Sequence, residues 1–279
     1  MTVGGSLSPA AASPQAGAGY WMLSHDGNVY PFGQAPDCGD PLQKDDFPMA
    51  ATWDIEPMPD NSGYWFIGHF YGTFAVGQRI CTDWPNPKYL MSGEATLNLL
   101  PNEMPVSLSA TPDGSGLWVF TDRGRVLPFG AAQWFGDMSG VALNDRVLDS
   151  VVTPSGKGYY MVAADGGIFT FGDAKFAGSM GGKPLNAQVV SMAPDPDGRG
   201  YWLLGWDGGI FTFDAPYYGS MGAVRLNAPT NGILASPTGR GYLMVAEDGG
   251  VFTFGDVPFY GSLGANPPDN MIAAIAVMR

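Results

Sequence analysis

The two histidines of the chain stand at matching places in neighbouring repeats of the sequence. His25 and His69 each occupy the seventh position of a fifteen-residue unit that begins Gly-Tyr-Trp. Two imidazoles on one face could transfer protons or bind a metal ion. A zinc site needs a third ligand, however, and no further His or Cys stands at a suitable spacing. We therefore predict no catalytic residue, metal or cofactor, and keep a hydrolase or lyase that uses the His25/His69 face as an alternative.

The same seventh position carries a different side chain in every repeat. Its occupants are His25, His69, Asp122, Ala164, Trp206 and Glu247. In a repeat protein the shared residues are committed to the fold, so function is expected where the copies differ. We expect these side chains on one face, either as ordinary solvent-exposed neighbours of turns or as a shared rim that binds a ligand.

A second candidate site lies in an insertion in the second repeat. Residues 81–105 make this repeat about eleven residues longer than the others and are predicted to protrude as a loop. Trp84, Lys88 and Tyr89 would supply flat aromatic faces and a cation for a sugar or a protein partner, since loops on rigid scaffolds often bind ligands. The alternative is that the insertion packs over its own repeat.

Six copies of the unit order the whole chain. They start at residues 19, 63, 116, 158, 200 and 241, so consecutive copies lie 41 to 53 residues apart. Each copy predicts a hairpin of an aromatic-rich strand and a return strand such as "GIFTF". Where Asp-Gly joins the two strands it predicts a type I′ turn, and the second copy breaks the pattern with "HFYGT". Glycine recurs at the ninth position in five copies, which indicates a left-handed backbone there.

Shorter apolar segments flank each hairpin. Small and aliphatic residues precede it, as in "LDSVVTPSGKG", and segments such as "FAGSM" or "YYGSM" follow it. Four strands in about 42 residues make one propeller blade, with the small-residue strand innermost. The fold class predicted is therefore an all-β, six-bladed β-propeller of four-stranded antiparallel blades.

The two ends of the repeat array predict a closed ring. The first hairpin has no strand before it, and "NMIAAIAVM" at 270–278 follows the last repeat without a hairpin of its own. Pairing this C-terminal strand with the first hairpin completes the first blade. We thus expect one propeller domain over 19–279, preceded by a flexible Ala/Ser/Pro/Gly tail over 1–18.

Composition excludes some partners. The chain of 279 residues has a net charge of −13 and an isoelectric point near 4.3, which disfavours nucleic acid and anionic membrane surfaces. No signal peptide is visible, and the longest apolar run, 271–278, is too short to span a bilayer. The interpretation favoured for Cys38 and Cys81 is two unpaired thiols, with a disulfide and a metal site as the alternatives.

The unit "GYWLLGWDGGIFTFDAPYYGSMG" resembles a tandem repeat of bacterial, chiefly actinobacterial, surface and secreted proteins. The likeness is close over residues 150–264 and looser before them. It implies a propeller outside a cell or on a particle, and it carries no established catalytic residues.

These observations predict a non-enzymatic recognition or structural module. Because no signal peptide is visible, we favour a virion component such as a phage tail protein, located extracellularly or on the virion surface. Its expected partners are a host-surface glycan or other virion proteins, with the N-terminal tail contacting other subunits of an assembly. The alternative is a stand-alone, secreted, lectin-like propeller with sugar sites between blades.

Overall fold

The computed structural model describes residues 19–40, 51–70, 73–81 and 97–278. The elements that these residues form are strands, and among them no helix is long and apolar enough to cross a membrane. The strands are β1 (Gly19–Ser24), β2 (Val29–Gly33), β3 (Ala51–Pro57), β4 (Gly63–Phe70), β5 (Thr73–Ile80), β6 (Pro105–Ala110), β7 (Gly116–Thr121), β8 (Val126–Gly130), β9 (Val147–Val152), β10 (Gly158–Ala163), β11 (Ile168–Gly172), β12 (Val189–Pro194), β13 (Tyr201–Gly205), β14 (Ile210–Phe213), β15 (Thr230–Ala235), β16 (Gly241–Ala246), β17 (Val251–Gly255) and β18 (Ile272–Val277).

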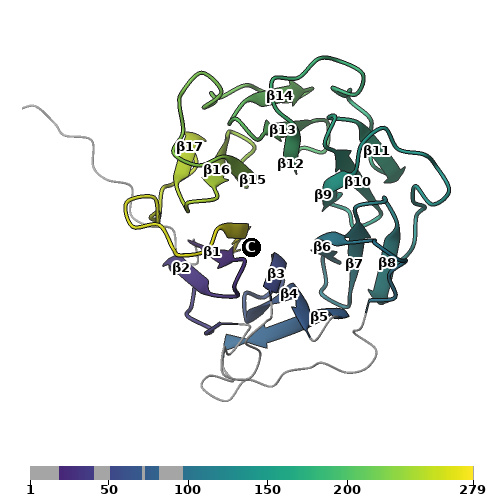
Figure 1. Ribbon diagram of the computed structural model, residues 1–279, viewed down its shortest axis with the longest axis horizontal. Helices are drawn as coiled ribbons and strands as arrows, with labels where there is room; N and C mark the ends of the chain where they lie inside the picture. Colours follow the sequence, from purple (N-terminus) through teal and green to yellow (C-terminus); the bar gives the residue numbers. More distant parts are fainter. Residues whose placement is uncertain (1–18, 41–50, 71–72, 82–96, 279) are drawn as a thin grey trace, which may run out of the picture.

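Across the described residues, these strands form six three-stranded antiparallel sheets around a central axis (Figure 1). The arrangement is that of a β-propeller, and we refer to each sheet as a blade, numbered along the chain. The inner strands β3, β6, β9, β12, β15 and β18 surround the centre, as their small side chains predict. The hairpins of the repeated unit supply the middle and outer strands.

The ring closes as the sequence predicts. Strand β18 pairs with β1 in an antiparallel register that places Tyr20 opposite Val277. The first sheet therefore has the order β18-β1-β2 and is built from both ends of the described chain. Closure removes the exposed edge that an open row of sheets would leave.

The core lies between blades because both faces of each middle strand are covered. Side chains alternate along a strand. Tyr201 and Leu203 therefore pack against blade four, whereas Trp202 and Leu204 pack against blade six. One such cluster fills each of the six junctions, which explains why the middle strands are apolar throughout.

The predicted type I′ turn is not formed. In blade four the N–H of Gly166 donates to the carbonyl oxygen of Ala163, and the glycine alone takes a positive φ, 75°. Asp165 instead uses its carboxylate, because Oδ1 accepts the N–H of Gly167 at 2.9 Å. This is the geometry of a three-residue hairpin loop with a glycine bulge. In such a loop the Asp carboxylate accepts a nearby backbone N–H, and the glycine is the residue with a left-handed backbone.

The predicted fourth strand is also absent from the described residues. The stretches 34–40, 131–138, 173–180, 214–221 and 256–263, here called outer segments, carry no strand. Each bonds to the next blade instead: Tyr201 donates its hydroxyl to the carbonyl oxygen of Gly178 and accepts the N–H groups of Ala177 and Gly178. The crossing requires a glycine, because φ is 138° at Gly178 and an added Cβ would strike the ring of Phe213 in the next blade.

Cys38 and Cys81 form a disulfide, so the favoured interpretation of two free thiols is wrong. Cys38 lies in the outer segment of blade one, and Cys81 follows the outer strand of blade two. The same crossing of outer segments to the next blade brings the two residues together, although 43 positions separate them.

The N-terminal tail, residues 1–18, lies outside the described residues. So do Trp84, Lys88 and Tyr89 of the insertion, of which the structure describes Cys81 and residues 97–105. The roles predicted for them stay predictions.

Candidate functional site

The seventh-position residues lie together on the face that carries the Asp-Gly turns, here called the turn face. Their backbone is structural. The N–H of Trp206 donates to the carbonyl oxygen of Gln188, and its own carbonyl oxygen accepts the N–H of Thr230 in the next blade. Equivalent bonds link His25 to Thr52, Asp122 to Val147, Ala164 to Val189 and Glu247 to Ile272. The backbone at this position makes the same kind of bond in five blades whatever the side chain, which explains why the side chain can vary.

A tryptophan lies between the two histidines. The ring centroid of Trp53 is 4.9 Å from that of His25 and 6.1 Å from that of His69, whose ring also packs 4.6 Å from Phe74. Burial lowers the pKa of His25, against the opposing charge of Asp26. In the described part of the chain, no group of three or more His, Cys, Asp or Glu residues could hold a metal ion. The histidines thus share an aromatic cluster.

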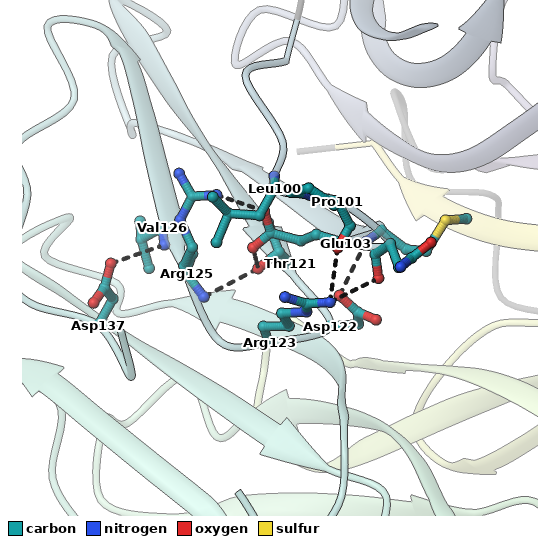
Figure 2. Close-up of polar contacts among 11 residues, drawn as sticks. Leu100, Pro101, Glu103, Thr121, Asp122, Arg123, Arg125, Val126 and Asp137 are labelled. Atoms are coloured by element: carbon teal, nitrogen blue, oxygen red, sulfur yellow. Dashed lines mark hydrogen bonds and ion pairs between the residues drawn. The ribbon is translucent and has the colours of Figure 1, made fainter. Parts of the chain in front are cut away.

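Asp122 belongs to a polar network that fastens the end of the insertion to blade three (Figure 2). Its Oδ1 accepts the N–H of Met104 at 3.0 Å. The buried Glu103 pairs with Arg125 at 2.5 Å and also accepts the hydroxyl of Thr121 at 2.8 Å. Arg123 donates to the carbonyl oxygen of Pro101. The last part of the insertion therefore packs over the turn of blade three, and Asp122 is engaged in holding it.

Trp206 and Glu247 meet across the junction between blades five and six. The indole Nε1 of Trp206 lies 3.5 Å from Oε1 of Glu247, and the tryptophan side chain remains 45% exposed. A cavity of about 260 Å³ beside the indole is lined by Trp206, Asp207, Val224, Leu226, Asn227, Ala228 and Pro229. Trp206 and Glu247 are therefore the seventh-position residues that the structure brings together beside this cavity.

Similar hollows recur on the turn face. One of about 310 Å³ lies between blades five and six and includes Asn227, Asp248 and Phe252. Another of about 270 Å³ lies between blades three and four and is lined by their counterparts Asn144, Asp165 and Phe169. The repeat thus produces near-equivalent cavities at separate junctions.

A surface that the sequence analysis missed lies on the outer segments. Four aromatic side chains, one in each of blades three to six, stand at equivalent positions and are about 60% exposed: Trp134 at 59%, Phe176 at 61%, Tyr217 at 60% and Phe259 at 58%. We call them the rim aromatics. The recurring aromatic two residues before the Gly of "FAGSM" or "YYGSM" is a sequence signal for them, although the pattern also predicts a fourth strand there.

Hydrogen bonds hold the backbone on both sides of three rim aromatics, Trp134, Phe176 and Tyr217. Next to Trp134, the carbonyl oxygen of Gln133 accepts the indole N–H of Trp118 at 2.7 Å, and the N–H of Phe135 donates to the hydroxyl of Tyr159 at 3.0 Å. Tyr217 is flanked in the same way, through Trp202 and Tyr242. Because the backbone is fixed, little further order is lost when a partner covers these rings.

One chain of the crystal structure of a nidogen/laminin complex resembles this protein in fold. The TM-score is 0.65, over 94% of this chain and 99% of that chain. The sequences are 8% identical, so the likeness concerns the fold alone. A scan against models of protein families finds no match, and a search of curated proteins finds none either.

The central cavity, of about 380 Å³, is lined by the inner strands. Its carboxylates join neighbouring blades. Asp54 accepts the N–H of Leu108 at 2.7 Å, and Asp149 accepts the hydroxyl of Ser191 at 2.7 Å. Burial raises the pKa of Asp149 and raises that of Asp54 well above its usual value, with the nearby charge of Asp149 adding to the effect on Asp54. Hydrogen bonds to protein donors account for both carboxylates, which therefore act as structural links.

Proposed function

We propose that this protein is a non-enzymatic recognition module that acts outside the cell, as a phage tail protein or another component of a virion. In this proposal the blades form a rigid scaffold, and the partner binds to side chains that the fold leaves free. The expected partner is a host-surface glycan or another virion protein.

The observation that carries the proposal is the set of four rim aromatics. Each exposes an aromatic side chain at the same place in its blade, and hydrogen bonds fix the backbone on both sides of Trp134, Phe176 and Tyr217. Scattered apolar residues on a surface need no explanation, but four rings repeated at one position of consecutive blades form a regular array. An array of equal contacts favours multivalent binding to a surface or to a repeating partner, where avidity exceeds the affinity of one contact.

The disulfide supports a location outside the cell. Bonds such as Cys38–Cys81 persist in oxidising compartments and are rare in the cytosol. The resemblance of residues 150–264 to repeats of bacterial surface and secreted proteins favours the same location.

Binding to intact cells tests the proposal. Labelled protein is titrated onto actinobacterial cells and bound fluorescence is measured by flow cytometry. We expect saturable binding that falls at least tenfold when Trp134, Phe176, Tyr217 and Phe259 are all changed to Ser. A control variant, Leu100→Ser with Met271→Ser, removes exposed apolar side chains outside the rim and should bind like the parent.

Two results would contradict the proposal. One is absence of saturable binding to cells and to purified particles; the other is equal binding by the parent and the rim variant. Mass spectrometry of purified particles and of culture supernatant checks the location separately, because a virion component must be present in the particles.

The second candidate is a stand-alone, secreted, lectin-like propeller. The near-equivalent hollows at the junctions of blades three and four and of blades five and six favour it. Calorimetry with a saccharide ligand would then give more than one site per chain, whereas an adhesin with a single site would give one.

A further inference from the structure

We propose that the junction of blades five and six binds a neutral saccharide ring, stacked on the indole of Trp206. The inference deepens the proposed function by naming a ligand class and a site. It stands on contacts of the turn face that are separate from the rim aromatics.

Trp206 forms a prepared platform. Its backbone is held on both sides, by Gln188 and by Thr230 of the next blade. The indole N–H points to Oε1 of Glu247 at 3.5 Å, a long contact that restrains the ring weakly. Nearly half of the side chain is exposed, although an indole is costly to leave in water. The apolar face of a pyranose ring, made of C–H groups, matches such a flat surface.

Polar groups free to bind hydroxyls surround this platform. Asp207 uses Oδ1 for the N–H of Gly209, at 2.9 Å, and its Oδ2 accepts no hydrogen bond from the described residues. Asn227 makes no side-chain hydrogen bond within that same part of the chain, so its amide offers both a donor and an acceptor. Sugar hydroxyls are donors and acceptors in turn, which suits a carboxylate and an amide side by side.

The charge of the site selects against anionic sugars. Asp207, Glu247 and Asp248 lie around the junction, and Arg225 is the basic residue among those that line its two cavities. The surplus of negative charge repels uronic or sialic acids, in a chain whose net charge is −13. A neutral sugar meets no such cost.

The cavity beside Trp206 has the size for one ring rather than for a large ligand. Its volume is about 260 Å³, below the range of roughly 300–1,000 Å³ that is usual for drug-sized molecules. Blade four has Ala164 at the position of Trp206, so the platform belongs to this junction and does not follow from the repeat.

The test uses the full chain and an array of neutral gluco-, manno- and galacto-oligosaccharides, with uronic and sialic acid glycans beside them. The best neutral saccharide is then titrated while tryptophan fluorescence is followed. We expect binding to neutral members and a loss of at least tenfold in affinity for Trp206→Ala, which introduces the residue that blade four already has.

A matched pair tests the polar partner. Asn186 occupies the position of Asn227 in the preceding blade but lies outside the described cavities, so Asn186→Ala should bind like the parent while Asn227→Ala loses affinity. The unfolding temperature of each variant shows that it is folded.

Three outcomes overturn the inference: no neutral saccharide bound, stronger binding of anionic glycans, or equal affinity in the parent and Trp206→Ala. If the saccharide is lost only in the rim variant, the ligand lies on the rim, and the inference fails while the proposed function stands. If the parent binds neither cells nor particles, the proposed function fails, whatever the array shows.

Discussion

The hydroxyl of Tyr242 in blade six lies 2.6 Å from the carbonyl oxygen of Gly219 in the outer segment of blade five. The same hydroxyl accepts the N–H groups of Tyr218 and Gly219, each at 3.1 Å. Corresponding contacts join Tyr20 to Gly261, Tyr64 to Gly39, Tyr159 to Gly136 and Tyr201 to Gly178. Blade three has Leu117 at this position. At each of five junctions, a tyrosine hydroxyl thus forms hydrogen bonds with the outer segment, in place of the backbone hydrogen bonds that a fourth strand would make.

Removing this hydroxyl should destabilise the protein. Tyr242→Phe leaves a partly buried carbonyl oxygen and two N–H groups without their partner, which we expect to cost about 1–3 kcal/mol of unfolding free energy. Denaturant unfolding measures it. Tyr217→Phe is the control, because the Tyr217 side chain is exposed and its hydroxyl bonds to no described residue. Equal stability of the two variants would show that the phenol contributes nothing beyond its ring.

The disulfide should stabilise the junction of blades one and two. We expect reduction, or the double variant Cys38→Ser with Cys81→Ser, to lower the unfolding free energy by about 2–4 kcal/mol, since the bond restricts the unfolded chain. Urea midpoints with and without dithiothreitol measure the effect. The double variant must not respond to the reductant, and an unchanged midpoint in the parent would argue against the bond.

The buried ion pair of Figure 2 should matter more than an exposed one. The Glu103 side chain is fully buried, so Glu103→Gln deprives Arg125 of its counter-charge and should cost about 1–3 kcal/mol. It should also expose residues 97–105 to proteolysis. Asp197→Asn, which breaks the exposed pair with Arg199, should change stability by less than about 1 kcal/mol. Similar losses in both variants would refute this difference.

The central carboxylates predict how stability depends on pH. The folded-state pKa of Asp54 is raised, so the folded protein binds the proton more tightly than the unfolded chain does. The contribution of Asp54 to stability is therefore fully present below the ordinary Asp pKa and is lost as pH rises through the raised pKa. As pH rises over that range, the parent should therefore lose unfolding free energy that Asp54→Asn keeps. Denaturant unfolding of both proteins at several pH values measures this difference.

Asp113 provides a control of opposite sign. Hydrogen bonds from the hydroxyls of Thr111 and Ser115 lower its pKa to about 2, so its contribution is present above the ordinary Asp pKa and is lost as pH falls. Asp113→Asn should lose stability relative to the parent as pH rises from about 2 to 4. Parallel pH profiles for the two variants would contradict both assignments.

Sequence reasoning found the repeats because they are local. The period, the apolar middle strands and the glycine of each turn all follow from backbone geometry and side-chain alternation within a few residues. The closure of β18 on β1 followed as well, because the two ends lacked complementary strands. The number of blades and the order of strands could therefore be predicted before the structure.

The tertiary structure alone decided what happens between blades. That Trp53 lies between His25 and His69, that Asp122 holds the insertion and that Cys38 meets Cys81 all depend on contacts between neighbouring blades. The outer segments left their own sheets for the same reason. Their backbone groups form hydrogen bonds with a tyrosine hydroxyl of the next blade. The sequence pattern of a single repeat does not show which neighbour supplies such a hydrogen bond.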